Sequence, residues 1–243
     1  MDRVLGFFGN PKLRADEALH YNFSVERRLG RRTRILSDFY DREDRRQAFA
    51  FYEPLLVGGK GVAYGIPYRN VVQGHARGVE VTVQRRSANG LTGWLSYAYS
   101  KTAYADATDG LRFPSDFDQR HTVTMFASYR FRPTFDISSQ WRYGTGLPVP
   151  GFINYDGKNT SLSEVRNGSR LPAYSRLDVR ANKAFLFKTA KLTLSVEVLN
   201  LMGCKNVFSI ATDPIRIYSA GRFSSQLESS IGVVPSISIA VSF

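Results

Sequence analysis

The last nine residues of the chain, Pro235-Ser236-Ile237-Ser238-Ile239-Ala240-Val241-Ser242-Phe243, alternate in polarity almost at every step. Successive side chains of a β-strand point to opposite faces, so this stretch predicts a strand with one apolar face and one small, mostly polar face. The apolar face would carry Ile237, Ile239, Val241 and Phe243. Such a strand fits a soluble sheet as well as a membrane barrel, and the rest of the chain must decide between them.

Eight further runs precede this strand and pair into four hairpins, and all of them alternate in the same way except 34–41, where the alternation is poor. The clearest turn is Asn89-Gly90, because Asn-Gly between two alternating runs is a strong hairpin signal. We therefore expect an all-β, antiparallel chain of about nine strands. The paired runs are 18–29 with 34–41, 79–84 with 91–100, 122–131 with 135–143, and 176–185 with 192–198.

The lengths of the runs and of their connections favour a transmembrane β-barrel over a soluble sandwich. Several runs span about ten residues, which a tilted membrane strand needs, whereas soluble strands average about 5–6 residues. Short connections alternate strictly with long ones at 51–73, 106–117, 146–172 and 201–233. This alternation is typical of barrels with short periplasmic turns and long extracellular loops.

Aromatic residues gather near the ends of the runs, as in the girdles that mark the two lipid–water boundaries of a barrel. The pairs are Tyr97 and Tyr99, Tyr129 and Phe131, Trp141 and Tyr143, and Phe185 and Phe187. The opposite faces carry charged residues, which suit a hydrated lumen. Core aromatics of a soluble sheet would explain the aromatic pairs, but not the run lengths or the alternating connections.

Composition excludes several other classes of protein. The formal charge of +12 comes from 33 Lys and Arg against 21 Asp and Glu, but most cations are spaced singly along the runs and no nucleic-acid-binding motif is present. Cys204 is the single cysteine, which excludes an intramolecular disulfide. No nucleophile elbow, metal-ligand spacing or phosphate loop is present, so we expect no enzyme activity, no cofactor and no nucleic-acid partner.

The strand count bears on how much of a barrel the chain represents. Single-chain bacterial barrels have an even number of strands with both termini at the periplasmic rim, so nine strands predict further strands upstream. The first residues, Met1 to Gly9, lack the apolar core and cleavage site of a signal peptide. We therefore expect residues 1–243 to be the C-terminal part of a larger barrel, without a plug domain or an export signal.

Several short phrases, in this order, resemble the C-terminal barrel region of TonB-dependent outer-membrane receptors. They are Asn10-Pro11-Lys12-Leu13, Arg77-Gly78-Val79-Glu80, Asp118-Gln119-Arg120-His121, Gly144-Thr145-Gly146-Leu147-Pro148, Leu171-Pro172-Ala173-Tyr174-Ser175-Arg176-Leu177-Asp178, Val198-Leu199-Asn200-Leu201 and the terminal Phe243. Met202-Gly203-Cys204 departs from the family, which often has an aromatic residue and Asn there.

The resemblance implies a barrel of about 22 strands in the outer membrane of a Gram-negative-type bacterium, with a plug in its lumen. It implies energy from a TonB-type protein acting through that plug, and recognition of Phe243 as an assembly signal by the barrel-assembly machinery. Outer-membrane lipid and lipopolysaccharide would surround the barrel. Substrates of the family are scarce and large, such as ferric siderophores, cobalamin, haem or oligosaccharides, and the sequence does not select among them.

Two sets of residues are candidates for contact with a substrate or the lumen. Arg176, Asp178, Arg180 and Glu197 fall on the charged side of their strands, where plug contact is the ordinary alternative. Tyr64, Tyr68, Arg69, Tyr155 and Arg170 fall in predicted loops and could bind an anionic ligand, although solvation or contact with lipopolysaccharide phosphates explains them as well. Asp118, Arg120 and His121 are expected to form a structural polar cluster at the rim.

The sequence thus favours a fragment of a TonB-dependent receptor, and leaves open a soluble or surface-exposed structural or adhesive β-protein. The alternative requires the apolar faces to be sealed in a core. In it, Leu192, Leu194, Val196 and Val198 would pack beneath a second layer.

Overall fold

The computed structural model describes residues 11–49, 52–57, 60–65, 68–87, 89–107, 110–157, 159–211, 222–224, 226–229 and 232–243. Every regular element in these residues is a β-strand. No helix in the described part of the chain is long and apolar enough to cross a membrane. The strands are β1 (Glu17–Leu29), β2 (Thr33–Phe49), β3 (Tyr52–Val57), β4 (Lys60–Gly65), β5 (Arg69–Arg85), β6 (Leu91–Asp106), β7 (Arg112–Pro114), β8 (His121–Arg132), β9 (Phe135–Gly144), β10 (Ile153–Tyr155), β11 (Asn159–Leu162), β12 (Tyr174–Leu186), β13 (Lys191–Leu199), β14 (Val207–Ala211), β15 (Arg222–Ser224), β16 (Gln226–Ser229) and β17 (Val234–Ser242).

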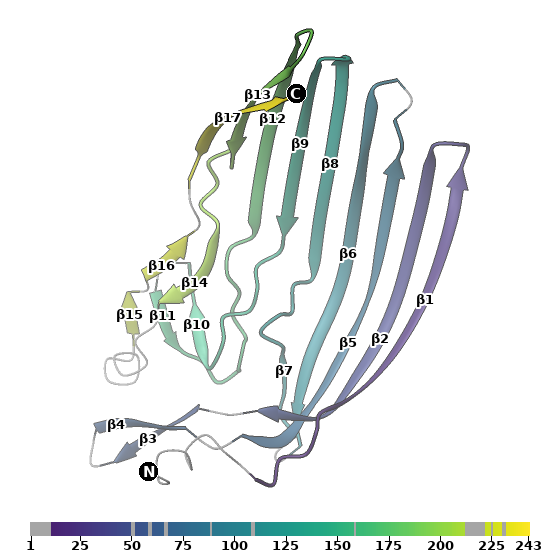
Figure 1. Ribbon diagram of the computed structural model, residues 1–243. Helices are drawn as coiled ribbons and strands as arrows, with labels where there is room; N and C mark the ends of the chain where they lie inside the picture. Colours follow the sequence, from purple (N-terminus) through teal and green to yellow (C-terminus); the bar gives the residue numbers. More distant parts are fainter. Residues whose placement is uncertain are drawn as a thin grey trace.

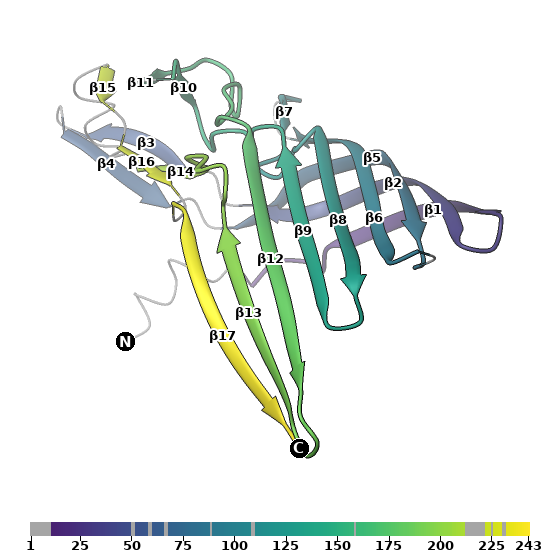
Figure 2. The same cartoon turned by 90° about the horizontal axis from the view of Figure 1, so that it is seen from above.

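One large antiparallel sheet organises the molecule, in the order β1-β2-β5-β6-β8-β9-β12-β13-β17, with β7 added beside β6. Figures 1 and 2 show this sheet as a curved wall that does not close on itself, with β1 and β17 at its two edges. Tight turns join the strands at one end of the wall, and the long connections gather at the other. The four predicted hairpins and the final strand are all present.

The register gives the sheet two chemically different faces, because directly paired residues share a face. On the apolar face, Leu95 pairs with Met125, which pairs with Trp141 on β9. On the polar face, Ser96 pairs with Thr124, which pairs with Arg142. We call these the apolar face and the polar face throughout.

Among the described residues, no second layer covers the apolar face of the last strands. Ile237 and Ile239 of β17 are 72% and 67% exposed, and their partners on β13 are Val196 and Leu194. Val196 is itself 42% exposed. The soluble alternative, in which the β13 side chains lie in a sealed core, is therefore wrong for this structure.

Aromatic side chains on the apolar face lie at both ends of the strands, as the sequence predicted. Tyr129 and Phe131 meet edge-on near the turn end, with ring centroids 4.6 Å apart. Trp141 and Tyr143 lie near the loop end, with ring centroids 6.1 Å apart. Rings at two levels are what a barrel needs where hydrocarbon gives way to headgroups.

The long connections contain more strand than the sequence predicted. Residues 51–73 were expected to be a loop, yet β3 and β4 pair within them and β5 already begins at Arg69. β2 likewise continues through a charged stretch to Phe49, with an irregularity between Asp44 and Gln47. Strands pair through their backbones and need no apolar side chains. The glycine, proline and charged residues of these segments therefore predicted loops where the structure has strands. The connections 146–172 and 201–233 similarly contain β10, β11, β14, β15 and β16.

The tightest packing lies at the loop end of the sheet, not between its faces. Val72, Phe113 and Val149 are almost fully buried there, as is the charged side chain of Asp118. A buried carboxylate needs compensating partners. The surroundings of Asp118 therefore show how the loops are held.

Candidate functional site

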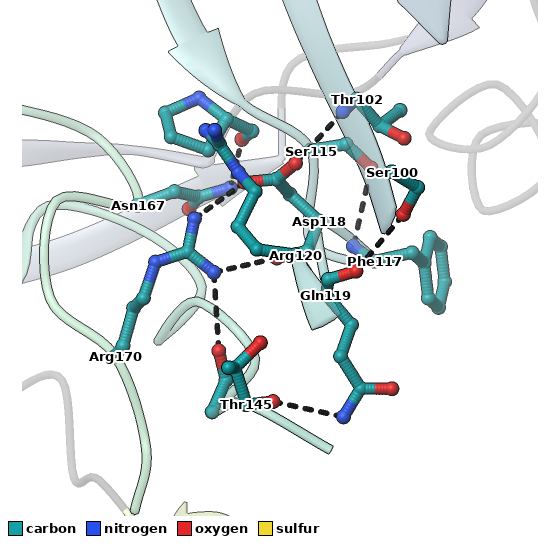
Figure 3. Close-up of polar contacts among 12 residues, drawn as sticks. Ser100, Thr102, Ser115, Phe117, Asp118, Gln119, Arg120, Thr145, Asn167 and Arg170 are labelled. Atoms are coloured by element: carbon teal, nitrogen blue, oxygen red, sulfur yellow. Dashed lines mark hydrogen bonds and ion pairs between the residues drawn. The ribbon is translucent and has the colours of Figure 1, made fainter. Parts of the chain in front are cut away.

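A cluster of four residues at the loop end, which we call the rim cluster, consists of Thr102, Asp118, Arg120 and Arg170 (Figure 3). Asp118 Oδ1 accepts a hydrogen bond of 2.7 Å from the backbone N–H of Thr102 on β6. Asp118 Oδ2 accepts one of 2.6 Å from Arg120 Nε and a second from Arg170 Nη2. One carboxylate thus ties β6 to the segment before β8 and to the β9–β12 connection.

Charge and burial together fix the protonation of this cluster. Burial raises the pKa of Asp118, but the Thr102 N–H and the two guanidinium groups outweigh it, and the net pKa lies below its ordinary value. The hydrogen bond to Asp118 raises the pKa of Arg120 against the opposing effect of burial. Asp118 and Arg120 are therefore both charged at neutral pH, which suits a structural anchor and not proton transfer.

Arg170 also closes the backbone around the cluster. Its Nη1 donates to the carbonyl oxygens of Asp118 at 2.5 Å and Gly146 at 3.1 Å. The sequence suggested Arg170 as a ligand for an anion, but the structure shows its guanidinium engaged by Asp118 and by backbone carbonyls. Anion binding by Arg170 remains a prediction.

Asn167 makes the second link between the two connections. Its side-chain amide donates to the carbonyl of Pro114 at 2.8 Å and to Asp116 Oδ1 at 2.6 Å, while its oxygen accepts from Gly151 N at 2.8 Å. Arg166 lies 5.3 Å from the centre of the Phe113 ring, and burial lowers its pKa. Segments 110–120 and 145–173 are consequently packed as one polar unit.

Gly146 allows the closest backbone approach in this unit. A Cβ at this position would lie 1.6 Å from the carbonyl oxygen of Leu171, so Gly146→Ala must displace the backbone. We expect it to cost about 3 kcal/mol, at the upper end for overpacking, and to expose residues 145–173 to protease. Thermal unfolding and limited proteolysis check this. Gly232→Ala is the matched control because no atom lies within 4 Å of its added Cβ, and an equal effect of both changes would contradict the expectation.

His121 directly follows Arg120 in sequence, but it lies on the apolar face, where it pairs with Tyr99. Its Nδ1 is 2.8 Å from the Tyr97 hydroxyl, and its ring centroid is 5.1 Å from that of Tyr99. His121 thus belongs to the loop-end aromatic level. The predicted polar cluster forms around Asp118 and Arg120 without it.

The predicted lumen candidates lie together on the polar face of β12 and β13. Arg176 Nε donates to Asp178 Oδ1 at 2.8 Å, and Asp178 also accepts from the backbone of Asn200 at 2.8 Å. Arg180 pairs directly with Glu197 across the strands. The alternation of the sequence predicted the side of their polar neighbours correctly, and the register places them on this face: Asp136, Gln140, Arg142, Asn182 and Ser195.

A hollow of about 420 Å³ lies on this part of the polar face, lined in part by Asp178, Arg180 and Glu197. Arg180 donates to Asn182 Oδ1 at 2.9 Å and to Ser195 Oγ at 3.1 Å. These side chains form a polar surface of mixed charge. It can make many hydrogen bonds to a second surface or to a passing polar solute.

The predicted loop candidates do not converge on one site within the described residues. Tyr68 and Arg69 are exposed at the start of β5, whereas the Tyr155 hydroxyl donates to the carbonyl of Gly157 at 2.8 Å. Tyr64 lies in β4, where only its backbone is described. Their binding roles remain predictions. Phe243 is fully exposed, and Asn10, Gly58 and Gly59 lie outside the described residues.

Solved structures show the same wall of strands. The chain matches the outer-membrane transporter YddB from Escherichia coli with a TM-score of 0.64 and 11% identity, covering 94% of this chain and 33% of that one. It matches the ferric-catecholate import receptor Fiu from E. coli K12 with a TM-score of 0.61 and 13% identity, covering 96% of this chain and 28% of that one. It matches the copper transporter OprC with a TM-score of 0.62 and 11% identity, covering 94% of this chain and 31% of that one. At these identities the likeness shows the fold alone.

The chain spans about a third of the length of those proteins. No curated protein matches the sequence. The family model described as TonB dependent receptor-like, beta-barrel matches residues 3–201, which is most of the chain. With its antiparallel wall, apolar outer face and paired aromatic levels, the chain belongs to the TonB-dependent receptor β-barrel family of the outer membrane.

Proposed function

We propose that this chain forms the C-terminal part of a receptor barrel that imports a scarce substrate across the outer membrane. The observation that carries the proposal is the chemical division of the sheet. Its apolar face suits lipid, while its polar face presents the mixed-charge surface around Arg180 and Glu197. A polar inner wall is what a plug domain and a hydrated substrate both require.

The open edges support a larger barrel in this proposal. On their free edges, β1 and β17 pair with no other strand of the described residues, and unpaired backbone groups cost several kcal/mol each in hydrocarbon. Both edges would pair with further strands, of about 22 in total, around a plug that a TonB-type protein engages. Phe243 would be recognised by the barrel-assembly machinery.

The substrate would be a ferric siderophore, cobalamin, an oligosaccharide or a similarly scarce solute. Arg176, Asp178, Arg180 and Glu197 would contact the plug or substrate from the wall, and Tyr64, Tyr68, Arg69 and Tyr155 would contact it from the loops. The rim cluster would hold the loops in place for that contact. Asp118 itself would not contact the substrate, because its side chain is buried and bonded to Thr102, Arg120 and Arg170.

A gene deletion in the source bacterium tests this function directly. We expect the deletion to abolish energy-dependent uptake of one radiolabelled substrate class from a panel of iron chelates, cobalamin, copper and oligosaccharides. Loss of the TonB-type protein should have the same effect, and the wild-type gene should restore uptake. The proposal would be overturned if every substrate in the panel were taken up normally both without this protein and without the TonB-type protein.

A pair of substitutions separates the polar wall from the lipid-facing surface. Arg180→Ala should lower the maximal uptake rate several-fold, because it removes contacts to Asn182 and Ser195 and to the solute or plug. Val198→Ala, on the apolar face of the neighbouring strand and outside the lining of the hollow, is the control and should leave uptake unchanged. Membrane fractionation and heat-modified gel mobility establish that both variants are assembled equally.

A further inference from the structure

The tight turns at one end of the wall carry most of the net charge of the chain. We call these four hairpin ends the turn rim, and they comprise residues 26–34, 85–91, 130–136 and 186–191. The turn rim holds eleven of the 33 Arg and Lys but only two of the 21 Asp and Glu. Three quarters of the formal charge of +12 therefore lies on four hairpins that follow one another along the wall (Figure 1).

The cations on the turns themselves are exposed and are not neutralised by the described residues. Arg31, Arg32, Arg86 and Lys188 lie between strands, and all four are exposed. In the part of the chain that the structure describes, no carboxylate lies within ion-pair distance of these four side chains. The turns thus present positive charge to whatever lies beyond this end of the wall.

Neighbouring hairpins repeat this charge at a regular distance. Adjacent strands are about 4.8 Å apart, so successive turns along the wall lie roughly 10 Å apart. That distance is close to the Debye length of about 8–10 Å at physiological ionic strength. The potentials of the four turns therefore overlap, and the turn rim forms one extended positive surface.

The position of the cations argues against a lipid headgroup or a protein as the partner. Besides the four cations on the turns, three lie on the polar face, away from hydrocarbon: Arg28, Arg34 and Lys191. A protein partner needs a cluster of apolar anchors, but Phe187 is the one large apolar residue in the turns between the strands. The nearby rings of Phe135 and Phe185 lie on the apolar face. A hydrophilic polyanion fits this surface best.

We propose that the turn rim binds the carboxylates of peptidoglycan, the anionic polymer that lies beneath the outer membrane. Guanidinium groups form bidentate, charge-assisted bonds to carboxylates, and nine of the eleven cations of the turn rim are arginine. A polymer whose carboxylates repeat along its length contacts several hairpins at once, so that individually weak ion pairs add up. The inference rests on the proposed function only for the orientation of the turn end toward the periplasm.

Sedimentation with isolated peptidoglycan sacculi tests the proposal, using the protein purified in detergent from its native membrane. We expect the wild type to sediment with the sacculi, and high salt to release it because exposed ion pairs are screened. Each exposed ion pair contributes about threefold in affinity. Arg31→Gln combined with Arg32→Gln and Arg86→Gln should therefore weaken binding roughly 30-fold.

A second triple variant, Arg77→Gln combined with Lys101→Gln and Arg112→Gln, is the matched control. These cations lie at the loop end, where Arg77 and Lys101 pair one row beyond Tyr99 on the apolar face and Arg112 lies in β7. Their loss changes the net charge by the same amount. The control should bind sacculi like the wild type, because its turn rim is intact.

Three outcomes would overturn the proposal. Equal losses in the two triple variants would show that only overall charge matters. Undiminished binding of the wild type to sacculi whose carboxylates have been converted to neutral amides would exclude carboxylate recognition. Binding to phosphatidylglycerol vesicles that is as tight as binding to sacculi, and equally weakened in the first triple variant, would indicate a lipid surface instead.

Heat-modified gel mobility checks that the variants are folded. If the first triple variant misfolds, Lys188→Gln alone serves in its place, and it should weaken binding to sacculi about threefold. Substrate uptake by all these variants should equal that of the wild type, so failure of sacculus binding is distinct from failure of the import function.

Discussion

Asp118→Ala is expected to release the β9–β12 connection from the sheet. The side chain is fully buried, whereas those of Arg120 and Arg170 are 30% and 31% exposed. Removing one member of a buried ion pair costs about 3–5 kcal/mol, and partial hydration of both arginines reduces this to about 3 kcal/mol. Opening of the loop unit should then rise roughly 100-fold. The measurement is the rate of protease cleavage within residues 145–173, which follows the open population when reclosing is fast.

Glu164→Ala is the matched control for this change. Glu164 is an exposed carboxylate in the same connection, so its loss should leave the cleavage rate unchanged. Asp118→Asn keeps an acceptor for the Thr102 N–H but not the negative charge, and it should restore only part of the protection. Unchanged cleavage in Asp118→Ala would show that the rim cluster does not hold the loops.

Adjacent positions on β8 should respond in opposite ways to a new charge. Ala127→Arg places a cation on the apolar face, midway between the two aromatic levels because its partner Ser139 lies halfway between Tyr143 and Phe135, and it should cost about 2–4 kcal/mol. Ser128→Arg places the same cation on the polar face, where its partner is Ser138, and should cost less than about 1 kcal/mol. The measurement is the urea-dependent folded fraction in lipid vesicles, read from heat-modified gel mobility. Similar losses for both variants would contradict the assignment of the faces.

The regular part of the sheet could be predicted from sequence because strand alternation repeats every two residues. The β8–β9 hairpin shows this, since the alternation of Val123 to Tyr129 and of Phe135 to Tyr143 predicted the face of each side chain. β3 and β4 could not be predicted, because glycine and proline in a paired strand look like those of a loop. For β2, the charged residues beyond Asp41 hid a strand whose stability comes from its backbone ladder with β5.

The rim cluster could be predicted only in part. Asp118 and Arg120 are two residues apart, and their phrase indicated a polar cluster. Arg170 lies 52 residues from Asp118, and no periodic pattern connects two irregular segments that meet in space. His121 was grouped with them by proximity in sequence, but strand alternation turns it toward Tyr97. Local pattern predicted the two members on one segment, and tertiary packing adds Thr102 and Arg170.

The spacing of the two aromatic levels determines which bilayer thickness matches the apolar face of this protein. Tyr143 and Phe135 mark the levels on β9 and are eight positions apart, which is roughly 26 Å along a strand and about 20 Å along the normal at a tilt of ~40°. That height matches a thin hydrocarbon layer, and the bacterial outer membrane is thinner than average. In a thicker bilayer, acyl chains would press against Arg77 and Lys101 at one end and Arg130 or Arg132 at the other. Hydrophobic mismatch would then favour the protein's accumulation in thinner regions of lipid.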